Sequence, residues 1–233
     1  MRILYAASEA TPYAKSGGLA DVAGSLPKAL VNDGIDCRVV MPLYGDIKIR
    51  DGLTYVTNFS VPVGWRSQYC GLFKSVYNGV TYYFIDNEYY FKRSGLYGFY
   101  DDGERFAFFS RAILEMLFYT DFEPDIISCN DWQTALTPVY LNLYYRHLDK
   151  FNHIKTVFTI HNIAYQGKYG LDILEDTCGI GNRDAHVVEY DGCANFMKGA
   201  IETADKITTV SPTYASEILD PLSLIHISEP TRH

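Results

Sequence analysis

The sequence predicts an α/β fold: a Rossmann-like, open and mainly parallel sheet with helices on both faces. Short, near-continuous apolar runs, typical of strands covered on both sides, alternate along the chain with longer segments of helical period. The 233 residues are 48% hydrophobic and 15% aromatic, enough to build one large packed domain or two small ones. Strands that alternate with helices at this spacing indicate a parallel sheet.

The first forty residues predict one strand, helix and strand unit. Residues 2–7 (RILYAA) predict a buried strand, residues 19–34 a helix that stops at Gly34, and residues 37–41 (CRVVM) a second strand. Pro27 within the helical pattern is expected to kink or interrupt the helix. The length of the unit suits a right-handed parallel crossover.

Residues 55–85 predict a β-rich excursion, because Asn78-Gly79 between FKSVY and VTYYFI is a strong hairpin signal. The rest of the chain returns to alternation. Helices are expected over residues 104–119, 135–145 and about 195–204, and strands over residues 126–129, 156–160 and 207–210.

Polar segments follow four of the predicted strands. In open α/β sheets, ligands bind beyond the carboxyl ends of the strands. We therefore expect these segments to converge on one crevice: residues 9–18, 130–133, 161–167 and 211–214.

The run Lys15-Ser16-Gly17-Gly18-Leu19 places a cation and two glycines just before a helix. Glycines let a phosphate approach the backbone, and a helix N-terminus supplies free N–H groups, so a diphosphate site is one interpretation and a simple turn is the other. The run is neither GxGxxG nor GxxxxGK[ST], which disfavours a dinucleotide-dependent oxidoreductase and a P-loop NTPase.

Four other features have both a functional and a structural interpretation. Asp131-Trp132 offers a hydroxyl acceptor and a stacking ring, or a helix cap and a core tryptophan, and His161-Asn162 offers two ligand contacts or a structural pair. Glu9 bonds a ligand hydroxyl or caps its loop. A carbohydrate platform or ordinary loop packing accounts for the aromatic run of Tyr89, Tyr90, Phe91, Tyr97 and Tyr100.

Composition excludes several classes of protein. The net charge is -8 and no Lys/Arg block exceeds a dipeptide, which argues against nucleic-acid partners. No apolar stretch approaches the roughly 18 residues that cross a bilayer, and the N-terminus lacks a signal-peptide pattern, so no membrane partner and a cytoplasmic location are expected. The five cysteines form no CxxC pair and the six histidines no HExxH or HxH cluster, so neither a disulfide framework nor a metal site is predicted.

Four motifs together resemble the N-terminal half of bacterial glycogen synthases, the ADP-glucose-dependent starch synthase family: MRILYAASEATPYAKSGGLADVAGSLPKAL, ISCNDWQTALTP, VFTIHNIAYQG and ADKITTVSPTYASEI. The resemblance covers residues 1–221. It implies a GT-B architecture of two Rossmann-like domains, and transfer of glucose from ADP-glucose to the non-reducing end of an α-1,4-glucan with retention. It also implies that no metal or other cofactor is required.

The resemblance also implies roles for particular residues. Lys15 matches the family's ADP-glucose-binding lysine, and Gly17 and Gly18 match the loop that approaches the diphosphate or sugar. Asp21, Asp131 and His161 match polar residues near the glucosyl group, with His161 and Asp131 as the catalytic pair. Glu9, Tyr97 and Asn162 are assigned to the same cleft.

The chain departs from the family in two ways. Family members are about twice as long, so residues 1–221 are expected to form the acceptor-side domain, with a missing C-terminal domain as its intramolecular partner and little activity alone. Residues 222–233 (LSLIHISEPTRH) resemble a translated sequencing adapter and are expected to be a non-native tail. Two alternative functions remain at this point: a GT-B transferase that uses another nucleotide sugar, and a glucan-binding module without catalysis.

Overall fold

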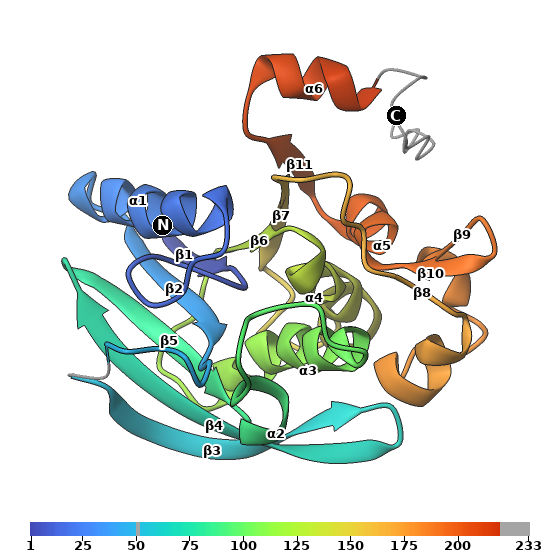
Figure 1. The fold of residues 1–233 in the computed structure, drawn as a ribbon, viewed down its shortest axis with the longest axis horizontal. Helices are drawn as coiled ribbons and strands as arrows, with labels where there is room; N and C mark the ends of the chain where they lie inside the picture. The colour runs from blue at the N-terminus through green and yellow to red at the C-terminus, as the bar shows by residue number, and fades with distance from the viewer. Residues whose placement is uncertain (50–51, 220–233) are drawn as a thin grey trace.

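The computed structural model describes residues 1–49 and 52–219, so the predicted tail at 222–233 lies outside the described residues. Its centre is an eight-stranded sheet of order β11-β7-β6-β1-β2-β5-β4-β3 (Figure 1). From β11 to β5 all neighbouring strands run parallel, and β4 and β3 continue the sheet antiparallel. The prediction of an open, mainly parallel α/β sheet is confirmed.

The bounds of the elements follow the predicted pattern with a few additions. The strands of the large sheet are β1 (Arg2–Ala6), β2 (Asp36–Pro42), β3 (Thr54–Val63), β4 (Arg66–Tyr77), β5 (Val80–Asp86), β6 (Ile126–Asn130), β7 (Lys155–Ile160) and β11 (Lys206–Thr209). The helices are α1 (Gly18–Asn32), α2 (Glu88–Phe91), α3 (Asp102–Glu115), α4 (Leu136–Tyr140), α5 (Phe196–Thr203) and α6 (Pro212–Leu219).

The first unit forms as predicted, with one difference. The sequence predicted a kink or an interruption at Pro27; helix α1 runs through Pro27 without interruption, so an interruption there is wrong. A proline within a helix removes one backbone hydrogen bond. Here Pro27 is buried on the packed face of α1, and this packing offsets the lost bond.

The hairpin between β4 and β5 turns at Asn78 and Gly79, whose φ angles are 50° and 82°. Positive φ at both turn residues matches the right-handed twist of the strands, which is why Asn-Gly is favoured there. The β-rich excursion is confirmed. It does not stand apart, however, because β5 pairs with β2 and so extends the main sheet.

The predicted helix over residues 135–145 is present but irregular. It begins with a 3₁₀ turn, η2 (Trp132–Thr134), continues as α4 and ends as a π-helical turn, η3 (Leu141–Tyr145). The Arg146 amide donates to the carbonyl of Leu141, five residues back, which is the π spacing. Such a change of hydrogen-bond register is not visible in the hydrophobic period.

A small second sheet of β8 (Lys168–Tyr169), β10 (Cys193–Asn195) and β9 (Glu189–Tyr190) was not predicted. Strands of two or three residues are too short to show a periodic pattern. They lie beside α5 (Figure 1).

The connections between the strands determine where on the sheet a ligand site is expected. From β1 through α1 to β2, the chain moves along the sheet toward its β3 edge. From β5 through α3 to β6, it moves back past β1 toward the β11 edge. The strand order therefore reverses between β1 and β6. Right-handed crossovers then put α1 on one face of the sheet and α3, α4 and α5 on the other. Ligands of such sheets bind where the order reverses.

Two further properties of the described residues concern the cysteines and the length of the helices. All five cysteines are free, and four of them are buried. None of the described helices has the length and apolar character needed to span a membrane.

Candidate functional site

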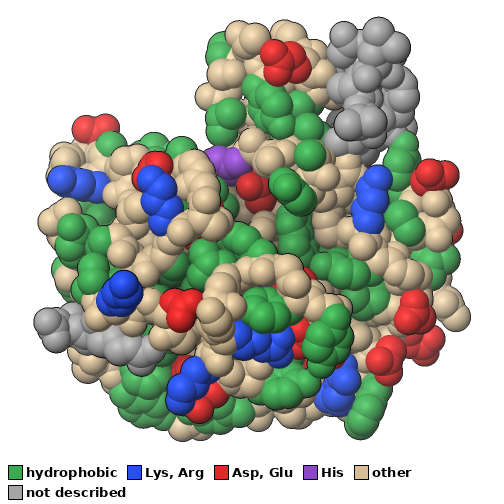
Figure 2. Space-filling view, viewed as in Figure 1, with side chains coloured by type: hydrophobic (Ala, Val, Ile, Leu, Met, Phe, Trp, Pro, Cys, Tyr) green, Lys and Arg blue, Asp and Glu red, His purple; other side chains and the backbone are tan. Residues whose placement is uncertain are grey.

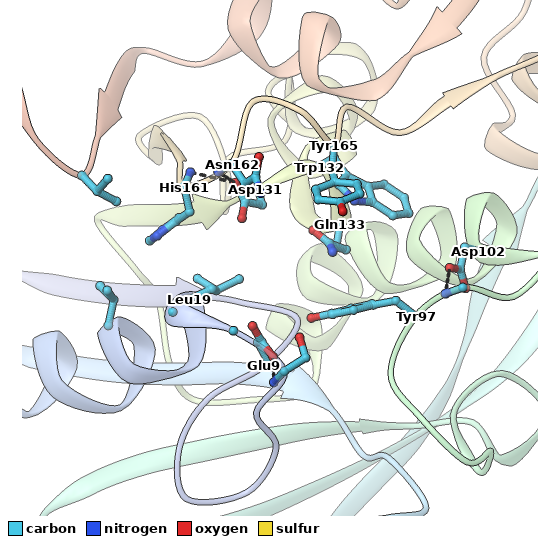
Figure 3. Close-up of a pocket in the computed structure, with 16 residues that line it drawn as sticks. Glu9, Leu19, Tyr97, Asp102, Asp131, Trp132, Gln133, His161, Asn162 and Tyr165 are labelled. Carbon is cyan, nitrogen blue, oxygen red and sulfur yellow. Dashed lines mark hydrogen bonds between the residues drawn. The ribbon is translucent and has the colours of Figure 1, made fainter. Parts of the chain in front are cut away.

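A cavity of about 850 Å³ opens at the carboxyl ends of β1, β6 and β7 (Figure 3). The expected convergence of strand ends is therefore found, with contributions from three of the four predicted segments and Val210 just before the fourth. The residues that line the cavity are Glu9, Ser16, Gly17, Gly18, Leu19, Val22, Tyr97, Gly98, Asp102, Asp131, Trp132, Gln133, His161, Asn162, Tyr165 and Val210.

The N-terminus of α1 faces this cavity. Gly17, the N-cap residue, has no side chain to cap the helix, and no hydrogen bond joins another described side chain to the first amides of α1. A Cβ at Gly18 would meet nothing within 4 Å. The helix therefore begins with uncapped N–H groups next to open space, a combination that suits an anion.

Glu9 holds the loop that leads into α1. Its side chain is 3% exposed, and its Oε2 accepts a hydrogen bond from the backbone amide of Ser16. Both interpretations of Glu9 are compatible with this position, because Glu9 fastens its loop and also lines the cavity.

Asp131 has an unusual backbone conformation, with φ 58° and ψ 178°. This region is costly for a residue other than glycine, by about 1–3 kcal/mol, and such residues cluster at functional sites. The side chain does not cap η2. Its Oδ1 instead accepts from the backbone amides of His161 and Asn162, at 2.8 and 3.2 Å.

The electrostatic state of Asp131 follows from its burial. Desolvation raises the pKa of the carboxyl to about 6, opposed by the two amide hydrogen bonds and assisted by the charge of Glu9. Oδ2 of Asp131 has no hydrogen bond to the described residues, so a ligand hydroxyl can donate to it. The tryptophan beside it belongs to the core: Trp132 is 9% exposed and contacts the rings of Phe106 and Phe196.

His161 lies at the end of β7, opposite the N-terminus of α1 (Figure 3). Its Nε2 lies 2.9 Å from Oδ1 of Asn130, and burial lowers the pKa of the ring to about 4. The imidazole is therefore neutral at physiological pH. Asn162, next along the chain, uses its Oδ1 to accept from the amide of Ala164 and stabilise the loop.

Tyr97 comes from the glycine-bearing loop before α3 and extends its ring into the cavity (Figure 3). Its hydroxyl lies 2.7 Å from the hydroxyl of Ser8, and burial raises its pKa. Tyr97 is thus a neutral aromatic side chain at the cavity wall. In the same aromatic run, Tyr90 and Phe91 are fully buried and Tyr100 is 91% exposed.

Lys15 and Asp21 are placed differently from the other candidates. Neither lines the cavity. Their side chains pair with each other, with Lys15 Nζ 2.7 Å from Asp21 Oδ1, and both are about half exposed. Lys15 lines a neighbouring cavity of about 430 Å³ together with Lys48. Among the predicted residues, therefore, seven are brought together and this pair lies beside them.

Gln133 is the residue that sequence reasoning missed. Its side chain is 8% exposed and lines the cavity (Figure 3), and its Oε1 has no hydrogen-bond partner among the described residues. A buried acceptor without a donor costs about 1–3 kcal/mol. A ligand hydroxyl would remove that cost. Its place within the strand-end segment 130–133 was the only signal in the sequence.

The charge pattern fits a site for a small ligand. On the face shown in Figure 2, Lys and Arg side chains are scattered singly and form no continuous basic patch. Within residues 1–49 and 52–219, no group of three or more His, Cys, Asp or Glu side chains is arranged to hold a metal ion.

Comparison of structures defines the class of protein. The chain aligns with the solved catalytic domain of starch synthase IV from Arabidopsis thaliana, described as bound to ADP and acarbose, with a TM-score of 0.83 and 33% sequence identity. The match covers 93% of this chain and 46% of that one. Together with the parallel sheet and the cavity at its switch point, this match defines the class of fold: one half of the GT-B architecture.

The family follows from the sequence match. Residues 2–227 match the model of the starch synthase catalytic domain, and the chain belongs to this family. The glycogen synthase of Clostridium acetobutylicum is 57% identical over 228 residues, covering 95% of this chain and 47% of the relative. That of Geobacillus stearothermophilus is 53% identical over 222 residues. The chain spans about half the length of these relatives.

Proposed function

We propose that this chain is the N-terminal, acceptor-side half of a glycogen or starch synthase. The proposed reaction transfers glucose from ADP-glucose to the non-reducing end of an α-1,4-glucan with retention of configuration. The observation that carries the proposal is the cavity at the β1/β6 switch point, within a chain that belongs to the starch synthase catalytic domain family.

The start of α1 is the proposed contact for the diphosphate. Gly17 and Gly18 leave the backbone accessible, and the uncapped amides offer hydrogen bonds and the positive end of the helix dipole. Lys15 contributes charge next to this position once its pairing with Asp21 is exchanged for the ligand. These groups stabilise negative charge on the departing nucleotide, as a metal ion does in other transferases.

The glucosyl group and the acceptor are proposed to lie between the ends of β6 and β7. Asp131 and Gln133 supply acceptors for hydroxyl hydrogens, and Tyr97 supplies an apolar ring. Positive charge develops on a sugar ring during transfer, and the proposed role of the buried carboxylate of Asp131 is to stabilise it. His161 is neutral and contributes a hydrogen-bonding ring rather than a charge.

The relatives contain about as much chain again, and we propose that this second half forms the other wall of the cleft. Catalysis by electrostatic preorganisation requires both walls. The chain alone is therefore expected to show little transfer and weak donor binding.

The test joins this chain, through residue 219, to the C-terminal half of the Clostridium acetobutylicum relative and measures incorporation of labelled glucose into glycogen. Incorporation from ADP-glucose, lost in the Asp131→Ala hybrid, is the expected result. A folded hybrid that transfers nothing would contradict the proposal, and preference for UDP-glucose would assign another donor. Transfer by the isolated chain at the rate of an intact synthase would contradict the need for a second wall.

A further inference from the structure

Asn130, the last residue of β6, contacts the ring of His161, which lines the cavity. Its side chain is fully buried, and its Oδ1 is 2.9 Å from Nε2 of His161. Asn130 does not line the cavity itself. Any effect it has on a ligand must therefore act through His161.

The orientation of the Asn130 amide is determined by its other partners. Its nitrogen donates to the backbone carbonyls of Ala6 at 2.9 Å and Ser128 at 3.2 Å. Carbonyl oxygens only accept, so the atom that faces them must be the nitrogen. The other atom is Oδ1, which also accepts from the hydroxyl of Tyr5 at 2.9 Å.

This orientation dictates the tautomer of His161. Oδ1 of Asn130 carries no hydrogen, so Nε2 of His161 must be the donor. A neutral imidazole has a single N–H group, and burial keeps this ring neutral at physiological pH. Nδ1 is then the unprotonated nitrogen, and it has no hydrogen bond to the part of the chain that is described.

We propose that Asn130 is a positioning residue that holds His161 in the Nε2–H tautomer and so leaves Nδ1 as a hydrogen-bond acceptor for the ligand of the cavity. A group that bonds to Nδ1 must bring a hydrogen. A sugar hydroxyl meets this requirement and an ionised phosphate oxygen does not. The inference rests on the proposed function only for the identity of this ligand.

Nitrogen-15 NMR of the isolated chain tests the tautomer directly. Long-range proton–nitrogen spectra of the histidine rings distinguish the two neutral forms, and the spectrum of His161→Gln identifies the signals of this ring among the six histidines. The Nε2–H form is expected throughout pH 6–8. The Nδ1–H form, or a mixture of both, would overturn the inference.

Two buried asparagines allow a matched comparison. Asn130→Asp replaces the amide by a carboxylate, which favours the imidazolium, so the pKa of His161 is expected to rise from about 4 to above about 6.5. Asn195 is also fully buried, and its amide bonds Gln166 and Lys198 instead. Asn195→Asp should therefore leave the tautomer and pKa of His161 unchanged. An equal response in both variants would mean that Asn130 has only a structural role.

Folding of Asn130→Asp is not required for a decision. The Nδ1–H tautomer in the unmodified chain would overturn the inference by itself. Tyr5→Phe adds a second check, because the two carbonyl partners of Asn130 remain and the Nε2–H form should persist. None of these readings depends on ADP-glucose or glucan, so failure of the proposed function would leave them unaffected.

Discussion

Replacing Asp131 by asparagine is expected to stabilise the fold at alkaline pH, although it removes a proposed functional group. Burial raises the pKa of Asp131 from 3.8 to about 6. A carboxyl whose pKa is higher in the folded chain than in the unfolded chain disfavours folding once it ionises. At about 1.4 kcal/mol per pH unit, the ionised form costs about 3 kcal/mol above pH 7 and about 0.5 kcal/mol at pH 4.

Asparagine avoids this cost because it stays neutral. Its side-chain oxygen can accept from the amides of His161 and Asn162 as the carboxylate does, and asparagine bears the same backbone cost as aspartate at φ 58° and ψ 178°, so this cost cancels in the comparison. We therefore expect Asp131→Asn to raise the free energy of unfolding by about 2–3 kcal/mol at pH 8 and by much less at pH 4.

Urea unfolding of the isolated chain, followed by circular dichroism at both pH values, measures this difference. Asp205→Asn is the control. Although burial acts to raise the pKa of Asp205, hydrogen bonds from Thr156 and Lys155 lower it, so its loss should destabilise the chain at pH 8. The reasoning is refuted if Asp131→Asn is the less stable protein at pH 8, or if its advantage is as large at pH 4.

Three further substitutions separate stability from ligand binding. Gln133→Leu removes a buried unpaired acceptor, so unfolding free energy should stay within about 1 kcal/mol of the original while activity of the two-domain hybrid falls about tenfold. Gly167→Ala should lower the free energy of unfolding in urea by about 2 kcal/mol or more, because the φ of Gly167 is 64° and a Cβ there would lie 2.6 Å from the ring of Trp132. Gly181→Ala is the control, because a Cβ at Gly181 would meet nothing within 4 Å. Gly18→Ala should fold normally but weaken ADP binding to the hybrid in calorimetry, since its Cβ would occupy the open space before the helix amides.

Local signals in the sequence were sufficient for most of the fold. Buried strands such as 156–160 are bounded apolar runs, and Asn78-Gly79 requires only the backbone freedom of two residues to make its turn. An interruption of α1 at Pro27 was wrong, because packing there overrides a local preference. The prediction was incomplete where an element is too short to have a period, as in β8 and β9.

For the site, the strand-end rule placed the correct loops together without placing their side chains. Seven predicted residues line one cavity because the carboxyl ends of parallel strands meet at one edge of the sheet. The rule could not predict that Lys15 pairs with Asp21, because the side chain of a residue in an exposed loop can point toward the cavity or away from it. Nor could it distinguish Gln133 from its neighbours, because what sets Gln133 apart is a buried Oε1 without a hydrogen-bond donor among the residues that the structure describes.

The sequence by itself determined the alternation of strands and helices, the hairpin and the family, because these depend on neighbouring residues and on ordered motifs. Only the tertiary structure decided the chemical state of the site. The carboxylate of Asp131 is held by amides 30 and 31 residues away, and the ring of His161 by an amide that Tyr5 and Ala6 help to orient. Desolvation and hydrogen-bond direction depend on atoms brought together across the sheet, and no local pattern contains that information.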